Sequence, residues 1–462
     1  SHFLFRPYDG EHMKSILKFF AAGPDAPLLE DKERVDSLYR KYRWQVMLAI
    51  TIGYGVVYTC RLALSVVKKP LIDEGIFTAD ELGIIGSALF YTYAFAKLTN
   101  GFLADHSNMK RFFSFGVLIS ALVNIAMGWT HLLWVWCVLW ALNGWFQGFG
   151  APAGMVSLAQ WFSNKERGRR YGIWSTAHSI GEGLTFIAVA GLVSLFGWKA
   201  GFMGPGLTCL GVAVLLYIYV QDRPRTLGLP SIADWKNDHG VPVLGGTGIQ
   251  PSVWELQRSI LKIPSIWILA LASAMMYITR YALNSWGILY LQEVKGYSLV
   301  EAGSMLGLNT IAGILGCLAY GYASDKLFHA RRPPVTLIVG LLEILALMII
   351  FYAPPGHPTL LTFAFVLYGF SLNGLVTTLG GLFATDIAPK KAAGAAMGFI
   401  GVFSYLAAAT QERISGYLIE KGTTIIDGVR QYDFSNVIIF WVGASVVSLV
   451  LATSLWNAKV SD

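Results

Sequence analysis

The 462-residue sequence has few charged residues and few cysteines. Charged residues make up 14% of the chain, hydrophobic residues make up 55%, and the mean hydropathy is +0.53. A soluble domain of this length could not hide so much apolar surface in its interior, which excludes an ordinary soluble protein. The cysteines lie singly in apolar segments without disulfide or metal-ligand spacing, so we expect them to be packing residues. They are Cys60, Cys137, Cys209 and Cys317.

Motifs of catalysis are also missing. The sequence has no phosphate-cradling glycine loop, no metal-ligand cluster and no nucleophile triad in a soluble domain. We therefore expect that the protein is not an enzyme, binds no cofactor and no metal, and has no nucleic-acid partner. The partners that we do expect are the lipid bilayer and small anions, and we expect a monomer.

Long apolar runs are abundant instead. Twelve of them can cross about 30 Å of hydrocarbon at about 1.5 Å per residue, and a polar segment separates two sets of six. The sequence thus predicts an all-α membrane protein with twelve transmembrane helices in two pseudo-symmetric six-helix bundles. The predicted helices lie near residues 45–67, 82–104, 112–130, 133–161, 169–196, 198–220, 264–292, 299–323, 334–353, 358–387, 392–420 and 434–457.

These runs divide the chain into five parts. Residues 1–12 lack the apolar core of a signal peptide and precede Met13, so we expect an expression-tag remnant. A cytoplasmic N-terminal segment over 13–44 leads into a first bundle over 45–221. A cytoplasmic linker over 222–262, rich in Pro and Gly, connects it to a second bundle and short tail over 263–462.

The positive charges predict the orientation. With residues 13–44 on the cytoplasmic side, the inward loops hold many more Lys and Arg residues than the outward loops. This asymmetry favours a multi-pass membrane protein with both termini inside. The outward loops would hold Lys68, Lys69, Lys199, Lys295, Lys421 and Arg430.

The two halves of the sequence repeat each other. The stretch YTCR ending at Arg61 recurs as YITR ending at Arg280, and GFLAD ending at Asp105 recurs as GYASD ending at Asp325. A duplicated six-helix unit places a substrate site near the midplane between the halves, where each half supplies equivalent groups.

Arg61 and Arg280 lie inside apolar helices. An arginine in lipid costs at least about 2.5–3.5 kcal/mol on insertion scales, so a pair at matching places predicts an anion that offsets them. Phosphate suits them, because guanidinium is a permanently charged, planar fork of donors. Arg280 is too far from both ends of its helix to reach a surface, whereas Arg61 could instead extend about 10 Å to the headgroups.

Other polar residues could complete this site or could only pack. Tyr58 and Tyr277 each precede an arginine by about one turn, where a phenol can donate to phosphate or line a sugar pocket. Lys97 is a third buried cation, which could instead reach the cytoplasmic interface. Five amides could bind hydroxyl groups or could equally join helices to each other. They are Asn143, Gln147, Asn284, Asn309 and Asn373.

His178 and Glu182 are candidates for a titrating pair. Imidazole titrates near neutral pH and could gain a proton as phosphate arrives, but a histidine that only hydrogen-bonds its neighbours is the alternative. Glu182 lies one turn later on the same face, where it could pair with His178. Glu412 and Arg413 form a second charged pair, which either faces the cavity or is neutralised by a neighbour.

Several stretches resemble a known family. RGRRYGIWSTAHSIG, from Arg167 to Gly181, resembles the signature of the organophosphate:phosphate antiporters of the major facilitator superfamily, which include hexose-6-phosphate and glycerol-3-phosphate transporters. YRKYRWQ, LNGWFQGFG and APKKAAGAAMGF extend this resemblance along the chain. The linker and the stretch GPDAPLLEDK resemble the bacterial hexose-phosphate sensor and its transporting relatives.

The resemblance implies roles for particular residues. It implies that Arg61 and Arg280 bind phosphate and that His178 joins them. It also implies that Asp105 and Asp325 belong to an inter-helix motif, in which capping or salt-bridging the helix ends is itself the gate latch. The sequence departs from the family pattern at Leu62, Ser175, Ser179, Glu182, Ser285 and Asn373-Gly374, which leaves the organic part of the substrate open.

Three functions are compatible with these observations. The first is an antiporter that exchanges a hexose phosphate such as glucose 6-phosphate for inorganic phosphate by alternating access. In it, two facing arginines repel each other until phosphate draws the halves together. The second is a membrane sensor that binds the same ligand and signals to a kinase. The third is a proton-coupled sugar symporter that uses His178 and Glu182, against which two midplane arginines argue.

Overall fold

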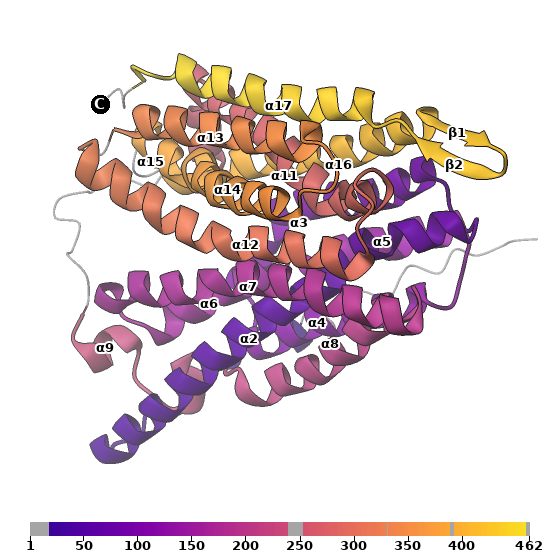
Figure 1. The fold of residues 1–462 in the computed structure, drawn as a ribbon. Helices are drawn as coiled ribbons and strands as arrows, with labels where there is room; N and C mark the ends of the chain where they lie inside the picture. The colour runs from indigo at the N-terminus through magenta and orange to yellow at the C-terminus, as the bar shows by residue number, and fades with distance from the viewer. Residues whose placement is uncertain (1–17, 239–252, 330, 389–391, 459–462) are drawn as a thin grey trace, which may run out of the picture.

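The computed structural model describes residues 18–238, 253–329, 331–388 and 392–458. Its helices lie in two layers, with α2–α8 in one and α11–α17 in the other (Figure 1). The first layer contains α2 (Lys32–Asp73), α3 (Ala79–Asp105), α4 (Met109–Met127), α5 (Leu133–Gln147), α6 (Gly150–Trp161), α7 (Asn164–Phe196) and α8 (Ala200–Tyr219). The linker contains η1 (Pro224–Leu227), α9 (Ile232–Lys236) and α10 (Val253–Ile260).

The second layer repeats the first in outline. It contains α11 (Pro264–Glu293), α12 (Leu299–Tyr322), η2 (Ala323–Leu327), α13 (Arg332–Tyr352), α14 (Pro358–Thr377), η3 (Thr378–Leu382), α15 (Phe383–Ile387), α16 (Ala393–Lys421) and α17 (Ser435–Ser454). Between α16 and α17, β1 (Thr423–Ile426) pairs antiparallel with β2 (Val429–Tyr432). The hairpin turns at Asp427 and Gly428, both with positive φ, as a two-residue turn of this kind requires.

The predicted fold class is confirmed. Within the described segments, ten helices are long and apolar enough to cross a membrane. The predicted fourth span is formed by α5 and α6 together, and the eleventh by α16. The main difference is α2, which was expected over 45–67 but runs from Lys32 to Asp73. Lys68 and Lys69 therefore belong to a helix, and assigning them to an outward loop was wrong.

Local signals explain where corresponding helices begin. At the start of α3 the Thr78 side chain caps the backbone N–H of Glu81, while the Glu81 carboxylate accepts from the Thr78 N–H. At the start of α12, Ser298 and Glu301 form the same reciprocal pair. Such capping boxes satisfy two otherwise free donors and fix the first turn. The internal repeat thus extends to the helix ends.

The fourth span is broken at Gly148 and Phe149. A Cβ at Gly148 would lie 2.7 Å from that of Ala96 and 2.8 Å from the Asn100 amide, so the close approach of α3 requires glycine there. The Asn100 amide donates to the Trp145 carbonyl at 3.2 Å, which satisfies an acceptor at the end of α5. The break is therefore stabilised by α3.

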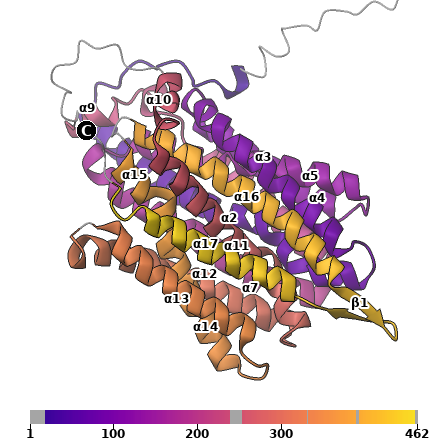
Figure 2. The ribbon, with the colours of Figure 1, turned by 90° about the horizontal axis from the view of Figure 1, so that it is seen from above.

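The molecule has two different ends. One end carries the β1–β2 hairpin, and we call it the hairpin end (Figure 1). The other carries the beginning of α2 and the end of α17, and we call it the terminal end. Between these ends α3 runs alongside α16, as Figure 2 shows, and α7 packs along α12. These two contacts, with a smaller one between α2 and α11, join the bundles.

In the hairpin half the bundles approach backbone to backbone. A Cβ at Gly83 of α3 would lie 2.5 Å from the Glu412 carbonyl of α16. A Cβ at Gly303 of α12 would lie 2.4 Å from the Phe186 carbonyl of α7. Contacts this short leave room only for glycine. The hairpin half is therefore tightly closed.

Toward the terminal end the same helix faces separate. On α3, Lys97 still approaches α16, since a Cβ at Gly401 would lie 3.5 Å from the Lys97 Cδ. Gly101 lies on the same face of α3, one turn closer to the terminal end. A Cβ at Gly101 would meet no other heavy atom within 4 Å, and the same holds for Gly398 of α16, Gly172 of α7 and Gly321 of α12. The bundles are thus closed at the hairpin end and apart at the terminal end.

Candidate functional site

Arg61 lies in the middle of α2 and points between the bundles. It is 5% exposed, and its Nη2 donates to the Tyr281 hydroxyl of α11 at 3.1 Å. Its guanidinium carbon lies 4.3 Å from the Tyr93 ring centroid and 5.3 Å from that of Tyr58, within cation–π range. The alternative that Arg61 extends to the headgroups is therefore wrong.

Arg280 occupies the corresponding place on α11. It is 8% exposed, and its guanidinium carbon lies 5.4 Å from the Tyr277 ring and 5.3 Å from the Tyr281 ring. The tyrosine one turn before each arginine thus takes the same position in both halves. Tyr281 contacts both guanidinium groups, since its ring centroid also lies 6.0 Å from the guanidinium carbon of Arg61. The two arginines are therefore brought together around one phenol.

Two further tyrosines, Tyr93 and Tyr405, also contact the cations of this site, although the sequence did not single them out. The Tyr405 ring of α16 lies 5.6 Å from the Arg61 guanidinium carbon and 5.0 Å from the Lys97 Nζ. Tyr93 contacts the same two cations at 4.3 and 5.9 Å. The spacing of Tyr93, one turn before Lys97, was a usable signal. Lys97 itself is exposed, on the side where the bundles separate.

Glu182 changes the electrostatics that the sequence predicted. Its Oε2 lies 3.9 Å from Arg280 Nη2, and its Oε1 accepts from the Asn284 amide at 2.5 Å. The expected pairing of Glu182 with His178 is therefore wrong in this structure. The expectation that two unpaired arginines hold the cavity open also needs correction, because Arg280 already has a counter-charge.

His178 lies beside the aromatic residues of α2. Its Nδ1 is 2.5 Å from the Ser175 carbonyl, so this nitrogen carries the hydrogen, and its Nε2 is 3.3 Å from the Ser179 hydroxyl. Its ring centroid is 5.9 Å from that of Tyr58. His178 thus lies close to the Tyr58 ring that covers Arg61. Its position alone does not make it a phosphate ligand.

A small cavity of about 10 Å³ adjoins Arg280, enough space for about one water molecule. Three of the predicted amides line it: Asn284, Asn309 and Asn373. The remaining lining residues are Ser179, Glu182, Arg280, Thr310 and Leu372. The cavity therefore presents hydrogen-bonding groups from α7, α11, α12 and α14 beside a guanidinium.

Asn143 and Gln147 take the structural role that the sequence left open. Asn143 donates to the Cys60 carbonyl at 3.0 Å, and Gln147 donates to the Val57 carbonyl at 3.1 Å. Both residues are buried and engage the backbone of α2 around Arg61. They hold the helix that carries the arginine and do not line the cavity beside Arg280.

Glu412 and Arg413 do not form a pair with each other. Glu412 lies 3.3 Å from Lys68, with side-chain exposures of 0% and 1%. Arg413 is 44% exposed and pairs with Asp80. A further ion pair joins Lys69 to Glu293. All three link the bundles in the hairpin half, so both glutamate and arginine are neutralised by neighbours from the other bundle.

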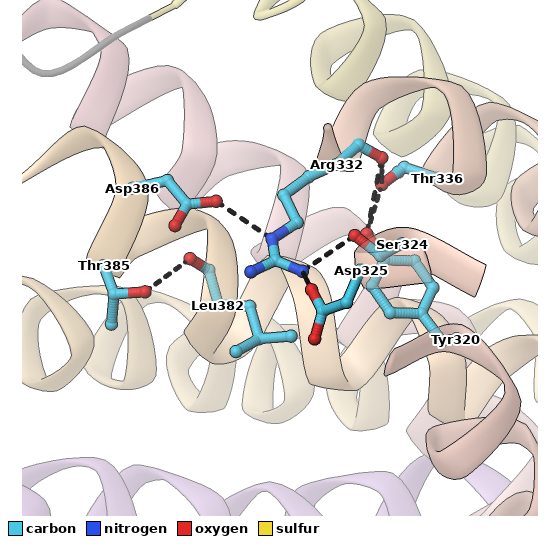
Figure 3. A network of polar contacts seen from close by, with 8 residues as sticks. All are labelled: Tyr320, Ser324, Asp325, Arg332, Thr336, Leu382, Thr385 and Asp386. Atoms are coloured by element: carbon cyan, nitrogen blue, oxygen red, sulfur yellow. Dashed lines mark hydrogen bonds and ion pairs between the residues drawn. The ribbon is translucent and has the colours of Figure 1, made fainter. Parts of the chain in front are cut away.

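Asp325 and Asp105 differ in their surroundings. Arg332 donates to the Asp325 carboxylate at 2.8 Å, to the Ser324 hydroxyl at 2.7 Å and to the Asp386 carboxylate at 3.0 Å (Figure 3). This network ties η2, α13 and α15 together at the terminal end. Asp105 ends α3 and is exposed. Of the two motif aspartates, Asp325 thus has the salt-bridging geometry that was expected.

Replacing Asp386 by asparagine should lower the free energy of unfolding by about 0.2–1 kcal/mol, because its ion pair with Arg332 is partly screened by solvent. Replacing Arg332 by glutamine should cost more, about 1–3 kcal/mol, since this 12% exposed side chain serves three acceptors. Thermal unfolding in detergent measures both. Equal losses for the two variants would show that the guanidinium does not organise this junction.

Comparison with known proteins decides the family. The sequence model of the Major Facilitator Superfamily matches residues 48–410. The chain belongs to this superfamily. The major facilitator fold also appears in a solved bacterial homolog of the human lysosomal transporter Spinster, in an inward-facing and unoccupied conformation. It aligns with a TM-score of 0.73 at 17% identity over 91% of this chain and 99% of that chain.

Two curated relatives within the superfamily are similar over nearly the whole chain. The membrane sensor protein UhpC of Salmonella typhimurium is 34% identical over 88% of this chain and 91% of its own length. A probable hexose phosphate transport protein of Chlamydia pneumoniae is 32% identical over 96% and 97%. These relatives confirm the family resemblance drawn from the sequence. The protein is a multi-pass integral membrane protein.

Proposed function

We propose that the protein exchanges an organic phosphate for inorganic phosphate by alternating access, with a hexose phosphate such as glucose 6-phosphate as the organic substrate. The observation that carries this proposal is the pair of buried guanidinium groups, one from α2 and one from α11, that contact the same tyrosine between the bundles. The probable hexose phosphate transport protein named above supports the sugar-phosphate class.

The geometry suggests how binding and movement are coupled. Phosphate enters from the terminal end, where the bundles are apart, and accepts donors from Arg61 and Arg280 in the fork arrangement that guanidinium offers. Tyr58, Tyr277 and Lys97 lie within reach of the same region. The anion offsets charge from both bundles and draws their terminal halves together. Without an anion Arg61 has no carboxylate partner among the described residues, so return of the empty protein is unfavourable, which produces one-for-one exchange.

The proposal also includes the orientation of the protein in the membrane and the bounds of its two bundles. The excess of Lys and Arg at the terminal end supports an orientation in which this end, with both termini, lies on the cytoplasmic side of a bacterial inner membrane. The open side is then cytoplasmic. The bundles over 45–221 and 263–462 move as bodies about the site, and the linker over 222–262 connects them. Part of this linker, residues 239–252, and residues 1–12 lie outside the described residues. The unit is a monomer without cofactor.

Counterflow in proteoliposomes tests the proposal. Vesicles loaded with inorganic phosphate should take up labelled glucose 6-phosphate, whereas vesicles loaded with phosphate-free buffer should not. A panel of sugar, glycerol and triose phosphates as inhibitors then ranks the organic part. If phosphate-loaded vesicles take up none of these esters, although the same preparation binds them, the proposed exchange function is wrong.

A sensor is the second candidate, favoured by the name of the 34% identical relative. A sensor would bind the same ligands with the same arginines and signal to a kinase. Turnover separates the two functions: a sensor shows saturable binding in detergent but no accumulation in loaded vesicles. A proton-coupled symporter of neutral sugar does not explain two buried arginines and is not proposed.

A further inference from the structure

Glu182 is a buried carboxylate that contacts the arginine pair. It is 5% exposed, its Oε2 lies 3.9 Å from Arg280 Nη2, and its Oε1 accepts from the Asn284 amide at 2.5 Å. We propose that Glu182 determines specificity: it makes the site select phosphate esters whose organic part carries hydroxyl groups and no second anionic group. This inference rests on the exchange function proposed above and names the class of ester that it accepts.

The charges around the site match a single phosphate dianion. The Tyr405 ring lies 5.6 Å from the Arg61 guanidinium carbon and 5.0 Å from the Lys97 Nζ, and Arg280 is within electrostatic range of the same phenol. These three cations and the Glu182 carboxylate give a net charge of +2. A phosphate monoester carries about −1.5 to −2 near pH 7, so its binding brings the site close to neutrality. A further carboxylate or phosphate on the ligand leaves an uncompensated negative charge, which is strongly unfavourable when buried.

Other ionisable groups near the site leave this sum unchanged. His178 donates from Nδ1 to the Ser175 carbonyl, and its Nε2 lies 3.3 Å from the Ser179 hydroxyl, which are partners that suit the neutral ring. Lys68 and Glu412 lie 3.3 Å apart and neutralise each other. The site is therefore balanced for one dianionic group.

The groups beside Glu182 suit hydroxyl groups. Amide and hydroxyl side chains dominate the lining of the cavity next to Arg280, and Leu372 is the apolar residue of that lining. A carboxylate accepts hydrogen bonds and donates none, so Glu182 can hold a ligand hydroxyl but repels a second anion. The cavity has space for about one water molecule, so a single hydroxyl group of the ligand, and not a whole sugar ring, fits there.

Lys97 is the competing determinant, because a second anionic group on the ligand could pair with it. Lys97 is exposed on the side where the bundles separate, whereas Glu182 is 5% exposed beside Arg280. Water screens the charge of an exposed ammonium, and a buried charge is screened much less. The carboxylate therefore outweighs the lysine in the choice between esters.

Inhibition of phosphate self-exchange in proteoliposomes of the full chain tests this inference. Glycerol 3-phosphate and 3-phosphoglycerate form a matched pair, because they differ only in a hydroxymethyl group against a carboxylate. The readout is the ratio of their half-inhibitory concentrations at about pH 8, where both phosphate groups are dianions. The wild type should prefer glycerol 3-phosphate by at least about tenfold, since placing like charges together costs more than one decade in affinity.

In Glu182→Gln this ratio should fall about tenfold or more. Glutamine keeps the shape of the side chain and an oxygen that accepts from Asn284, but it removes the negative charge. The net charge of the site then matches a ligand with three negative charges. A purely structural role of Glu182 would weaken both esters alike and would leave the ratio unchanged.

Glu343→Gln is the matched control. Glu343 is also a buried glutamate, 2% exposed, but it accepts from Ser445 within the second bundle and is absent from the cavity lining. Its replacement should keep the ratio of the wild type. Equal inhibition of the wild type by both esters, an unchanged ratio in Glu182→Gln, or the same fall in Glu343→Gln would each overturn the inference.

A binding measurement separates this inference from the proposed function. Both esters should displace labelled phosphate from the protein in lipid nanodiscs with the same ratio as in the exchange assay. A wild type that shows this preference in binding but does not exchange phosphate would overturn the exchange function and leave the role of Glu182 intact. Exchange without the preference would overturn the role of Glu182 alone.

Discussion

Replacement of Arg280 by alanine is expected to reduce phosphate exchange by about 30- to several-thousand-fold. Truncating one partner of a buried charged pair costs about 2–5 kcal/mol, and here the lost groups are the donors of the second bundle to the substrate. Counterflow of labelled phosphate in proteoliposomes measures the effect. Arg280→Lys should exchange phosphate at a rate between those of the wild type and Arg280→Ala, because lysine keeps the charge but loses the planar fork.

The Arg280 variant needs a control for stability. Removing Arg280 leaves Glu182, which is 5% exposed, without its counter-charge, and this alone destabilises the fold. The double variant Arg280→Ala with Glu182→Gln should recover thermal stability without recovering exchange. Arg61→Ala should lose exchange with little loss of stability, since Arg61 pairs with tyrosines and no carboxylate is left behind. Normal exchange by either alanine variant would refute the phosphate site.

Replacement of Glu412 by alanine is expected to produce the largest change in conformation. Among the described residues, it leaves the Lys68 ammonium, 1% exposed, with the Ser285 hydroxyl and the Trp286 ring as partners. Breaking a buried ion pair on one side costs about 3–5 kcal/mol, and opening the hairpin end would restore water to the lysine. The melting temperature should fall, and single cysteines placed at the hairpin end should become more reactive toward impermeant thiol reagents.

The matched variant replaces both partners, Lys68→Met with Glu412→Leu. Apolar side chains of similar volume remove the orphaned charge, so the double variant should melt close to the wild type and should keep the hairpin end closed. Arg413→Ala provides a surface comparison, because its pair with Asp80 is exposed and should contribute little. A double variant as unstable as Glu412→Ala would mean that shape, and not charge, closes this end.

The sequence predicted most of the fold because lipid imposes one simple requirement on each helix. Apolar runs of sufficient length marked eleven of the spans closely. The prediction failed for α2, where Lys68 looked like a loop residue. Its charge is tolerated in the helix because Glu412, far away in the sequence, lies 3.3 Å from it. No local pattern contains that partner.

The candidate site was predicted to a similar degree and for a similar reason. The repeat of YTCR and YITR located Arg61 and Arg280, because duplication leaves a trace that can be read along one chain. The partner of Glu182 could not be found in this way. Spacing on α7 favoured His178, whereas the packing of α7 beside α11 presents Arg280 and Asn284 to the carboxylate. Choices between helices depend on packing and not on periodicity.

The glycine contacts of the hairpin half imply that the two ends differ in their tolerance of mutation. A side chain added at Gly83 of α3 would meet the Glu412 carbonyl at 2.5 Å, and one added at Gly416 of α16 would meet the Ala79 carbonyl at 2.5 Å. Even alanine would act there as a wedge between rigid backbones. At Gly101 and Gly398 the same change meets empty space. Natural variation and engineered labels should therefore be accepted at the terminal half of these helices and rejected at the other.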